Sequence, residues 1–500
     1  MLEYIAEGFL ACLQWQSILN MILGCAFGIV IGALPGLGPM MGIALLLPFT
    51  FGMESVHGML LLVGVYCGGI YGGSITAILI RTPGTAASAA TVEDGFALSQ
   101  QGRAFSALQM ACTASVIGGL LSGIVLLFGS PQVARMALRF GPPEYFTLAL
   151  FGLAIISRVS GTSILKGITM ALLGILFTTI GMDPVQGVFR YSFGSLVMLS
   201  GINLISVIIG LFAVSEVLNQ VFKGQATIKT EGSSLEDSFD FMEVWRTKWN
   251  ILRSSLIGIV IGAVPGTGAS ISAFLAYSEA RRTSKKPELF GHGSLEGIAA
   301  SEAANNATCG GTLIPMMTLG IPGDATTAIL LGGLLIHGLT PGPTLFTNHP
   351  NVVYPILIGF ILLQFIMMFE GQLAIRFFAR MTNIPLSILM PVVFNLCLIG
   401  TYACANTMNV VIVMAVFTAI GYIMPKLGYP TIPMLIAFVL GSITETSLRQ
   451  SLVLSQGSLS IFFTRPISLL FLLMVFLSLF FTPIKNMLLR LIRRRSPGGQ

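Results

Sequence analysis

Long apolar stretches recur through this chain, and they limit its fold more than any other feature of the sequence. A membrane-spanning helix needs roughly 20 consecutive, mostly apolar residues. Of the 500 residues, 54% are hydrophobic and only 9% are charged, whereas a soluble protein carries roughly 25% charged residues. We therefore predict an all-α polytopic membrane protein with about 12 transmembrane segments in the lipid bilayer. Clear examples are the windows 17–34, 106–128, 195–222, 353–369, 406–424 and 466–482.

The charges and cysteines argue against several other classes of protein. The net charge is +6, but basic residues cluster in the short tracts 280–286 (ARRTSKK) and 490–495 (RLIRRR). Such tracts are typical of the cytoplasmic ends of membrane spans, so we expect no nucleic acid partner. The seven cysteines all lie in apolar stretches, and their odd number argues against a disulfide framework. No His lies near Cys397 and Cys404, so we predict no resident metal.

Catalytic constellations are not recognisable in the sequence. It contains no nucleophile-base-acid set, HExxH motif or Walker motif. The predicted spans hold almost no reactive His or paired acids, and few charges line up as the rings of a pore would. The sequence therefore predicts a protein that is not an enzyme, and it gives a channel little support.

An internal repeat divides the chain into two halves. GALPGLG at 32–38 matches GAVPGTG at 262–268 after an offset of 230 residues. YGGSITAILIRTPGTAASAA from Tyr71 matches CGGTLIPMMTLGIPGDATTA from Cys309, with an offset of 238 that becomes 239. The longest polar stretch, 223–250, reads as a surface linker between the halves. We predict a first transmembrane repeat at 1–222 and a second at 251–500, with hairpins near 72–92 and 310–337.

The basic residues predict that the two repeats are inverted in the membrane. The loop after the second PG motif carries four basic residues, whereas the matching loop of the first half has Glu54 and no Lys or Arg. The loop after the first hairpin carries Arg103, and its counterpart has no basic residue. Both biases change sides between the halves, which favours inverted topology. Arg135 and Arg139 alone fall where this arrangement places the outer side.

Each repeat contains a Pro-Gly break inside an apolar stretch. Backbone groups at membrane depth need partners, so such breaks survive only where they are buried in protein or line a watery cavity. After Pro83-Gly84 and Pro322-Gly323 come short hydroxyl or acidic residues that can cap a following helix. A helix that begins inside the protein presents amide donors and a positive dipole end, which suit a carboxylate. We predict two re-entrant hairpins that form a binding site.

Several residues are candidates for this site, and each has a structural alternative. The hydroxyls are neutral donors, and the glycines let the backbone approach a ligand, but Pro-Gly also kinks helices and small residues also pack them. Asp324 is a candidate for binding a coupling cation or for capping its helix, and Asn305 and Asn306 for cation coordination or hydrogen bonds between helices. Arg81 either pairs with the substrate or extends to the interface. The substrate-binding candidates are Gly36, Gly38, Ser74, Thr82, Gly84, Thr85, Ser88, Gly266, Gly268, Thr312, Gly323, Thr326 and Thr327.

The same motifs resemble a known family. GALPGLGP, YGGSITAILIRTPGTAASAATVEDG, GAVPGTGASISAF and GGTLIPMMTLGIPGDATTAILLGGL are similar to motifs of the large membrane subunit of the bacterial tripartite tricarboxylate transporters, the TctA family. The resemblance covers essentially the whole chain, including the order of the motifs. It implies flanking Gly-rich turns at 35–38 and 265–268, with hairpin tips at 82–88 and 321–327.

The resemblance also implies a function and its partners. A TctA subunit works in the bacterial inner membrane with a small membrane subunit of about four helices and a periplasmic solute-binding protein. Substrates of the family include citrate and other tricarboxylates and dicarboxylates, with Na⁺ or H⁺ as the coupling ion and an elevator-like movement. The alternative is a carrier or channel for organic anions that needs no binding protein. A panel of carboxylates is needed to identify the substrate.

Overall fold

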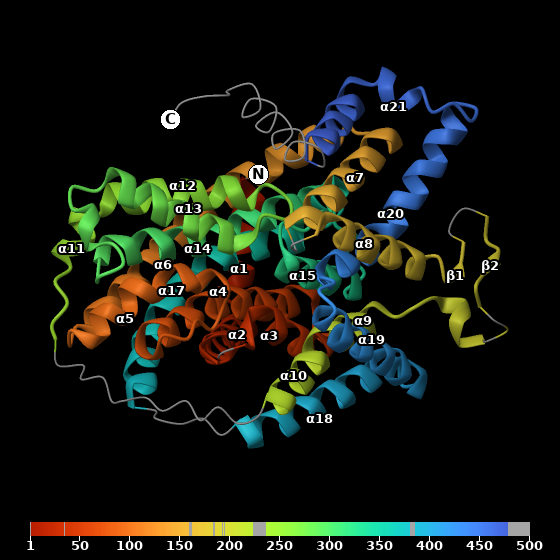
Figure 1. Cartoon of the computed structure of the whole chain (residues 1–500). Coiled ribbons are helices and arrows are strands. Elements are labelled where there is room, and N and C mark those ends of the chain that lie inside the picture. The colour runs from red at the N-terminus through yellow and green to blue at the C-terminus, as the bar shows by residue number, and fades with distance from the viewer. Residues whose placement is uncertain are drawn as a thin grey trace, which may run out of the picture. The chain divides into compact units, whose positions relative to one another are not determined.

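The structure, a computed structural model, is almost entirely helical (Figure 1). It describes residues 2–34, 36–159, 163–183, 186–192, 194, 196–223, 237–380 and 386–478. Helices make up 81% of it, with 18 helices of seven or more residues. The predicted all-α class is therefore confirmed.

Seven of the described helices are long and apolar enough to cross a membrane. Five shorter apolar helices accompany them, among them Gly38–Thr50, which follows the first Gly-rich turn, and Ala325–Ile336, which lies within the second predicted hairpin. The chain is thus a multi-pass membrane protein by the length and composition of its helices, while the count of about 12 spans and the re-entrant hairpins stay predictions. The seven are Trp15–Ala33, Ser55–Ile80, Ala104–Ala137, Leu204–Phe222, Pro350–Phe378, Met408–Lys426 and Ile432–Leu454.

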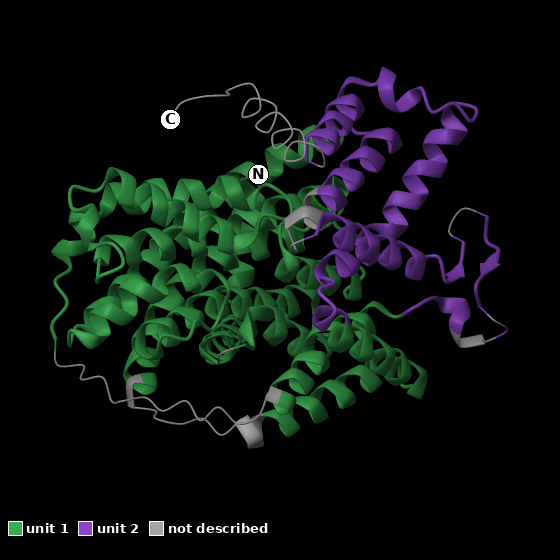
Figure 2. Ribbon diagram, in the orientation of Figure 1, with its two compact units in different colours: residues 1–138, 203–423 green, residues 139–202, 424–500 purple. Residues whose placement is uncertain are grey.

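The chain forms two compact units, and each takes segments from both sides of the polar stretch (Figure 2). Unit 1 comprises 1–138 and 203–423, and unit 2 comprises 139–202 and 424–500. Both predicted hairpins and both Gly-rich turns therefore belong to unit 1.

Unit 1 contains the larger set of helices. Its elements are α1 (Leu2–Cys12), α2 (Trp15–Ala33), α3 (Gly38–Leu46), η1 (Leu47–Thr50), α4 (Ser55–Ile80), η2 (Ala87–Thr91), α5 (Val92–Gln100), α6 (Ala104–Ala137), α9 (Leu204–Ile208), η4 (Ile209–Val214), α10 (Ser215–Lys223), α11 (Met242–Arg246), α12 (Lys248–Gly262), α13 (Gly268–Thr283), η5 (Pro287–Leu289), α14 (Leu295–Leu319), α15 (Ala325–Ile336), α16 (Pro343–Asn348), α17 (Pro350–Arg380), α18 (Leu386–Ala405) and most of α19 (Met408–Lys426).

Glycines bring the two central helices of the first half into backbone contact. Gly24, Gly28 and Gly32 recur every four residues along one face of α2, which packs on α4. A Cβ built on Gly32 would lie 2.1 Å from the carbonyl oxygen of Gly69, so a side chain here would force the helices apart. Small residues at such spacing are the usual means of close helix packing in membranes. The most apolar window of α4 is 94% buried inside the protein, which places α4 at the centre of unit 1.

Helices α12 and α14 repeat this arrangement in the second half, where they lie side by side (Figure 1). A Cβ on Gly258 would lie 2.3 Å from the carbonyl oxygen of Ala304, and one on Gly262 would lie 2.8 Å from that of Thr308. The equivalent helices of the two halves therefore pack through the same close contacts between glycines and backbone carbonyls.

The predicted span at 195–222 is wrong at its start. Gly201 has a left-handed backbone, with φ of 80°, and it separates the 3₁₀ turn η3 (Leu196–Ser200) from α9. The side chain of Asn203 accepts a hydrogen bond from the amide of Ser206 at 3.1 Å, which caps α9. The apolar helical segment therefore begins at Leu204.

The far end of the predicted linker is attached to a helix. Of the stretch 223–250, residues 224–236 lie outside the described part of the chain. The carboxylate of Asp237 accepts hydrogen bonds from the amides of Phe105 and Ser106 at 3.1 and 2.9 Å. An acid at this position satisfies amides at the start of α6 and complements its dipole. The linker therefore supports a helix of the first half.

Unit 2 is a smaller helical group with one short hairpin. Helix α20 packs against α7 and α8, and an ion-pair network joins it to the β1–β2 hairpin. Within this network Arg190 lies 2.6 Å from Glu445, and Arg449 lies 2.8 Å from Asp183. The elements are α7 (Pro142–Val159), α8 (Ile164–Thr178), β1 (Gly181–Met182), β2 (Phe189–Arg190), η3, α20 (Ile432–Leu454), α21 (Ile461–Thr464) and a helix at Pro466–Ser478.

Candidate functional site

Helices α4 and α14 end in the same way at equivalent positions. Arg81 and Gly320 follow their last residues, and both have left-handed backbones, with φ of 56° and 71°. The amide of Arg81 donates to the carbonyl of Thr76, and that of Gly320 donates to the carbonyl of Pro315. Glycine adopts this conformation freely, whereas it costs another residue roughly 1–2 kcal/mol. The first hairpin therefore holds an arginine at a position that suits glycine.

The tips of both hairpins are glycines that touch backbone. A Cβ on Gly84 would lie 1.9 Å from the carbonyl oxygen of Gly32, and one on Gly323 would lie 2.9 Å from that of Gly262. The amide of Gly84 also donates to the carbonyl of Gly73 at 3.2 Å. Each tip therefore rests on the last turn of the helix that precedes the Gly-rich turn of its own half, and only glycine allows this approach.

A polar side chain accepts a hydrogen bond from an amide of the helix that follows each tip. Thr85 Oγ1 accepts a hydrogen bond from the amide of Ser88 at 3.1 Å, before η2. Asp324 Oδ1 accepts one from the amide of Thr327 at 2.8 Å, and Thr327 Oγ1 accepts one from the amide of Asp324 at 2.9 Å. This reciprocal pair is a capping box. The first turns of both helices carry amide donors and partial positive charge, which favour anions.

The Gly-rich turns have the same backbone shape in both halves. The φ angles are 87° at Gly36, 61° at Gly38, 81° at Gly266 and 67° at Gly268. All four are left-handed, which explains why glycine occupies both positions of each turn. Pro35, predicted as part of the first turn, lies outside the described residues.

Each turn also lies beside the hairpin tip of its own half. The amide of Gly266 donates to the carbonyl of Gly323 at 2.7 Å. In the first half, a Cβ on Gly38 would lie 3.9 Å from the carbonyl oxygen of Gly84. The predicted turns and tips are thus brought together in pairs.

Contacts across the halves join the two pairs. The hydroxyl of Tyr66, on α4, lies 3.0 Å from Thr312 Oγ1 and donates to Asp324 Oδ2 at 3.0 Å. Helix α3 packs against α15, and α13 packs against η2. The helix after each Gly-rich turn therefore covers the hairpin helix of the other half.

The remaining candidates differ in their exposure. Ser74, Thr312 and Thr326 are buried, whereas Thr82 is exposed and its hydroxyl donates to the carbonyl of Ile80 at 3.2 Å. Thr82 is therefore the candidate hydroxyl that solvent reaches most easily at the first tip.

Asn305 and Asn306 lie in the middle of α14 and are buried. The side-chain nitrogen and oxygen of Asn306 have no hydrogen-bond partner among the described residues, whereas the side chains of Asn305 and Ser74 lie beside the carboxylate of Glu302. Buried polar groups are rarely left unpaired. The side chain of Asn306 is therefore available to a ligand in the interior of unit 1.

Glu302 and Tyr66 are two residues that sequence reasoning missed. Glu302 is fully buried, and its carboxylate accepts hydrogen bonds from Thr91 Oγ1 and, at 3.3 Å, from Ser115 Oγ. A signal was present, because Glu302 is an acid inside the Ala-rich stretch EGIAASEAANNATCGG at 296–311. Tyr66 gave no such signal, since it lies in a continuous apolar run.

Asp94 attaches α5 to the loop before α14. Its Oδ1 accepts hydrogen bonds from the amides of Gly291, Gly293 and Ser294 at 2.8, 3.0 and 2.9 Å. The hydroxyl of Tyr277 donates to its Oδ2 at 2.8 Å. Bonds to a carboxylate are stronger than neutral ones, so Asp94 holds α5 firmly against α13 and the start of α14.

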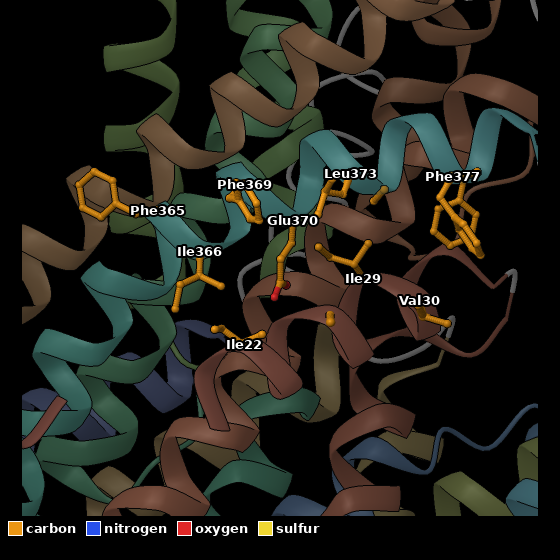
Figure 3. A pocket seen from close by; sticks show the side chains of 12 residues that line it. Ile22, Ile29, Val30, Phe365, Ile366, Phe369, Glu370, Leu373 and Phe377 are labelled. Atoms are coloured by element: carbon orange, nitrogen blue, oxygen red, sulfur yellow. The ribbon is translucent and has the colours of Figure 1, made fainter. Parts of the chain in front are cut away.

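A recess of about 720 Å³ lies between α2 and α17, and no hairpin residue lines it. Its walls are apolar except for Glu370, whose side chain points into it beside Ile22 and Ile29 (Figure 3). The thiol of Cys25 lies beside the carboxylate of Glu370, whose two oxygens have no other hydrogen-bond partner among the described residues. This recess is separate from the predicted site.

The hairpins carry little charge. Arg81 is the only Lys or Arg in 72–92 and 310–337. It is exposed, and its guanidinium carbon lies 5.7 Å from the centre of the Phe96 ring. The other donors are neutral hydroxyls and helix amides. This combination suits a small anion, because helix N termini and arginine both favour carboxylates.

The chain is similar to known proteins along most of its length. Residues 18–436 match the family described as "Tripartite tricarboxylate transporter TctA family". An "Uncharacterized 52.8 kDa protein in TAR-I ttuC' 3'region" of Agrobacterium vitis is 33% identical over 475 residues, which are 94% of this chain and 93% of that protein. An "Uncharacterized protein in TAR-II ttuC' 3'region" of the same organism is 34% identical over 211 residues, which are 42% of this chain and 87% of that protein. No solved structure matches.

We predict that alanine at either tip glycine destabilises the protein, and that the loss is larger where the added Cβ lies closer to a backbone oxygen. Gly84→Ala meets a backbone oxygen, so it lowers the free energy of unfolding by about 1–3 kcal/mol or more, and Gly323→Ala has a smaller effect. Gly52→Ala is the matched control, because nothing lies within 4 Å of its Cβ position. Thermal unfolding of the purified variants ranks their stabilities. Equal unfolding temperatures for Gly84→Ala and Gly52→Ala would show that the tip does not rest on Gly32.

Proposed function

The chain belongs to the tripartite tricarboxylate transporter TctA family, and on that premise we propose that it is the large membrane subunit of a tripartite importer of organic acids. In this proposal it is a multi-pass subunit of the bacterial inner membrane. A periplasmic solute-binding protein delivers a tricarboxylate or related acid, and a small membrane subunit of about four helices completes the complex. The chain itself moves the substrate.

The observation that carries the proposal is the duplicated hairpin tip. Gly84 and Gly323 lie at equivalent positions, each followed by a helix whose first turn donates an amide hydrogen bond to a polar side chain, and each beside a Gly-rich turn. Two helix N termini supply donors for an anion without a buried positive charge that would bind it too tightly for release. The donors we assign to the carboxylates are Ser74, Thr82, Thr85, Ser88, Thr312, Thr326 and Thr327, with the backbone at Gly36, Gly38, Gly84, Gly266, Gly268 and Gly323.

We assign to Arg81 the attraction of the anion to the first tip. The residue keeps a left-handed backbone that glycine would adopt without cost. A strained conformation at a site is a reason to ask what its side chain contributes, and here the side chain is the only Lys or Arg of both hairpins.

Transport is coupled to a cation gradient, Na⁺ or H⁺, and follows an elevator-like movement of the hairpin-bearing part. Asp324, Asn305 and Asn306 are the first candidates for the cation. An acid near a carboxylate substrate needs a cation or proton to offset its charge, which gives coupling a physical reason.

Uptake by proteoliposomes tests the proposal. The vesicles contain this subunit and its small partner, with the binding protein added or omitted, under imposed Na⁺ or proton gradients. Labelled citrate and a panel of dicarboxylates and tricarboxylates are offered. We expect accumulation that requires both the gradient and the binding protein.

The outcomes separate the alternatives. Accumulation without the binding protein would indicate an independent carrier of organic anions, and flux that only equalises concentrations would indicate a channel. Vesicles without the small subunit are the control for its role.

We predict that Arg81→Gly separates stability from transport. Glycine removes the cost of the left-handed backbone, so the free energy of unfolding rises by roughly 1 kcal/mol. Loss of the guanidinium raises the KM for the carboxylate, and Arg81→Lys, which keeps a charge, lies between. Uptake at varied substrate concentration and thermal unfolding give both quantities. An unchanged KM in Arg81→Gly would remove Arg81 from substrate recognition.

A further inference from the structure

Arg135 is a basic residue on the predicted outer side of the membrane. It lies in the last turn of α6 and is exposed. Basic residues are depleted from outer loops, and Arg135 is one of two that depart from the predicted inverted topology. Among the described residues, no ion pair joins it to an acid, including Glu3 and Glu7 on α1. Its guanidinium therefore carries a positive charge that no ion pair within the described chain neutralises.

Arg135 lines a pocket of about 290 Å³ that is formed by α1, α6, α16 and α17. Helix α16 packs against α6 and α17, and α1 packs against α17. The rings of Tyr4 on α1 and Tyr354 on α17 stack in its wall, with centroids 5.6 Å apart. Phe346 and Thr347 of α16 also line it, and Arg135 is the only charged residue among the described ones that do. The pocket therefore combines one positive charge with aromatic walls.

Helix α6 is longer than a bilayer is thick. Its 34 residues span roughly 51 Å, whereas the hydrocarbon core and both headgroup layers together measure about 40–45 Å. Arg103 precedes its first turn on the predicted cytoplasmic side, so the last turn, with Arg135, projects at the outer surface. This length places the pocket beyond the outer headgroups, which favours a protein over a lipid as its occupant.

The residue types in this pocket are those of a protein interface. Arginine and tyrosine are among the residues that most often carry the binding energy between proteins. A single exposed arginine holds a free carboxylate weakly, because water competes for both charges. An acid on a docked protein binds more strongly, because the surrounding contacts exclude water and arginine can donate two hydrogen bonds to it. The pocket therefore suits an Asp or Glu side chain of a partner protein better than a free organic acid.

We propose that this pocket is a docking site for the periplasmic solute-binding protein, and that an acidic side chain of that protein pairs with Arg135 in it. The inference rests on the proposed tripartite function and names the surface that the partner uses. The amide of Gly342, just before α16, donates to the carbonyl of Met317 in the last turn of α14 at 3.0 Å. The docked protein therefore contacts a segment that is attached to the second hairpin.

Binding of the purified solute-binding protein to the two membrane subunits in nanodiscs tests the site without transport. We expect Arg135→Gln to raise the Kd about tenfold, as the loss of an interface hot spot does. Salt weakens binding by the wild-type complex more than binding by this variant, because salt screens the pair of charges. Arg103→Gln changes an exposed arginine at the other end of the same helix. It is the matched control and leaves the Kd unchanged.

A second variant blocks the pocket while Arg135 stays in place. Thr347 is exposed, and Thr347→Glu supplies an acid from the chain itself, so we expect a higher Kd, whereas Thr347→Gln keeps the wild-type value. An unchanged Kd in both Arg135→Gln and Thr347→Glu would overturn the pocket and leave the tripartite function standing. An effect of Arg135→Gln only in nanodiscs that contain phosphatidylglycerol would overturn it in favour of a lipid headgroup site. No binding by the wild-type complex would reject the pocket and the tripartite function together.

Discussion

The contact between a glycine tip and a backbone carbonyl is the constraint on which the architecture of unit 1 depends. Gly84 rests on the carbonyl of Gly32, and Gly323 rests near that of Gly262. A break in a membrane helix leaves backbone groups that water cannot satisfy, so it must be held by other backbone at close range. Glycines along α2 and α12 allow this close approach. Helices η2 and α15 then begin just after each break. The same glycines therefore determine both the packing of the central helices and the position of the hairpins.

The two hairpins are alike in backbone and unlike in charge. The Thr85 hydroxyl accepts an amide hydrogen bond from η2, whereas Asp324 caps α15 with a carboxylate. Arg81 stands where the second hairpin has Gly320. One hairpin therefore carries a positive charge and the other a negative charge around an otherwise neutral set of donors. An anion bound near the positive charge and a cation bound near the negative charge would neutralise both. Substrate recognition and cation coupling would then depend on the same pair of charges.

Sequence patterns predicted those parts of the structure that depend on local chemistry. Hydropathy predicted the helical membrane class. The repeated PGxG motif indicated two Gly-rich turns, and the structure shows that their glycines at 36, 38, 266 and 268 are left-handed. Contacts between distant segments left no local trace, so the bond from Tyr66 to Asp324 and the division into units that cross the halves could not be predicted. The start of the span near 204 was misjudged because apolar composition hid the break at Gly201. Glu302 was visible as an acid in an apolar helix, but only the structure shows its oxygen neighbours.

The central claim is that both tips bind one carboxylate substrate, and hydrogen exchange measures this most directly. A carboxylate identified by uptake is added to the purified protein, and amide exchange is followed by mass spectrometry at 82–92 and 321–330. The account predicts slower exchange in both segments and no change in helix α16 (Pro343–Asn348). Protection of neither segment, under conditions where the carboxylate binds, would contradict it.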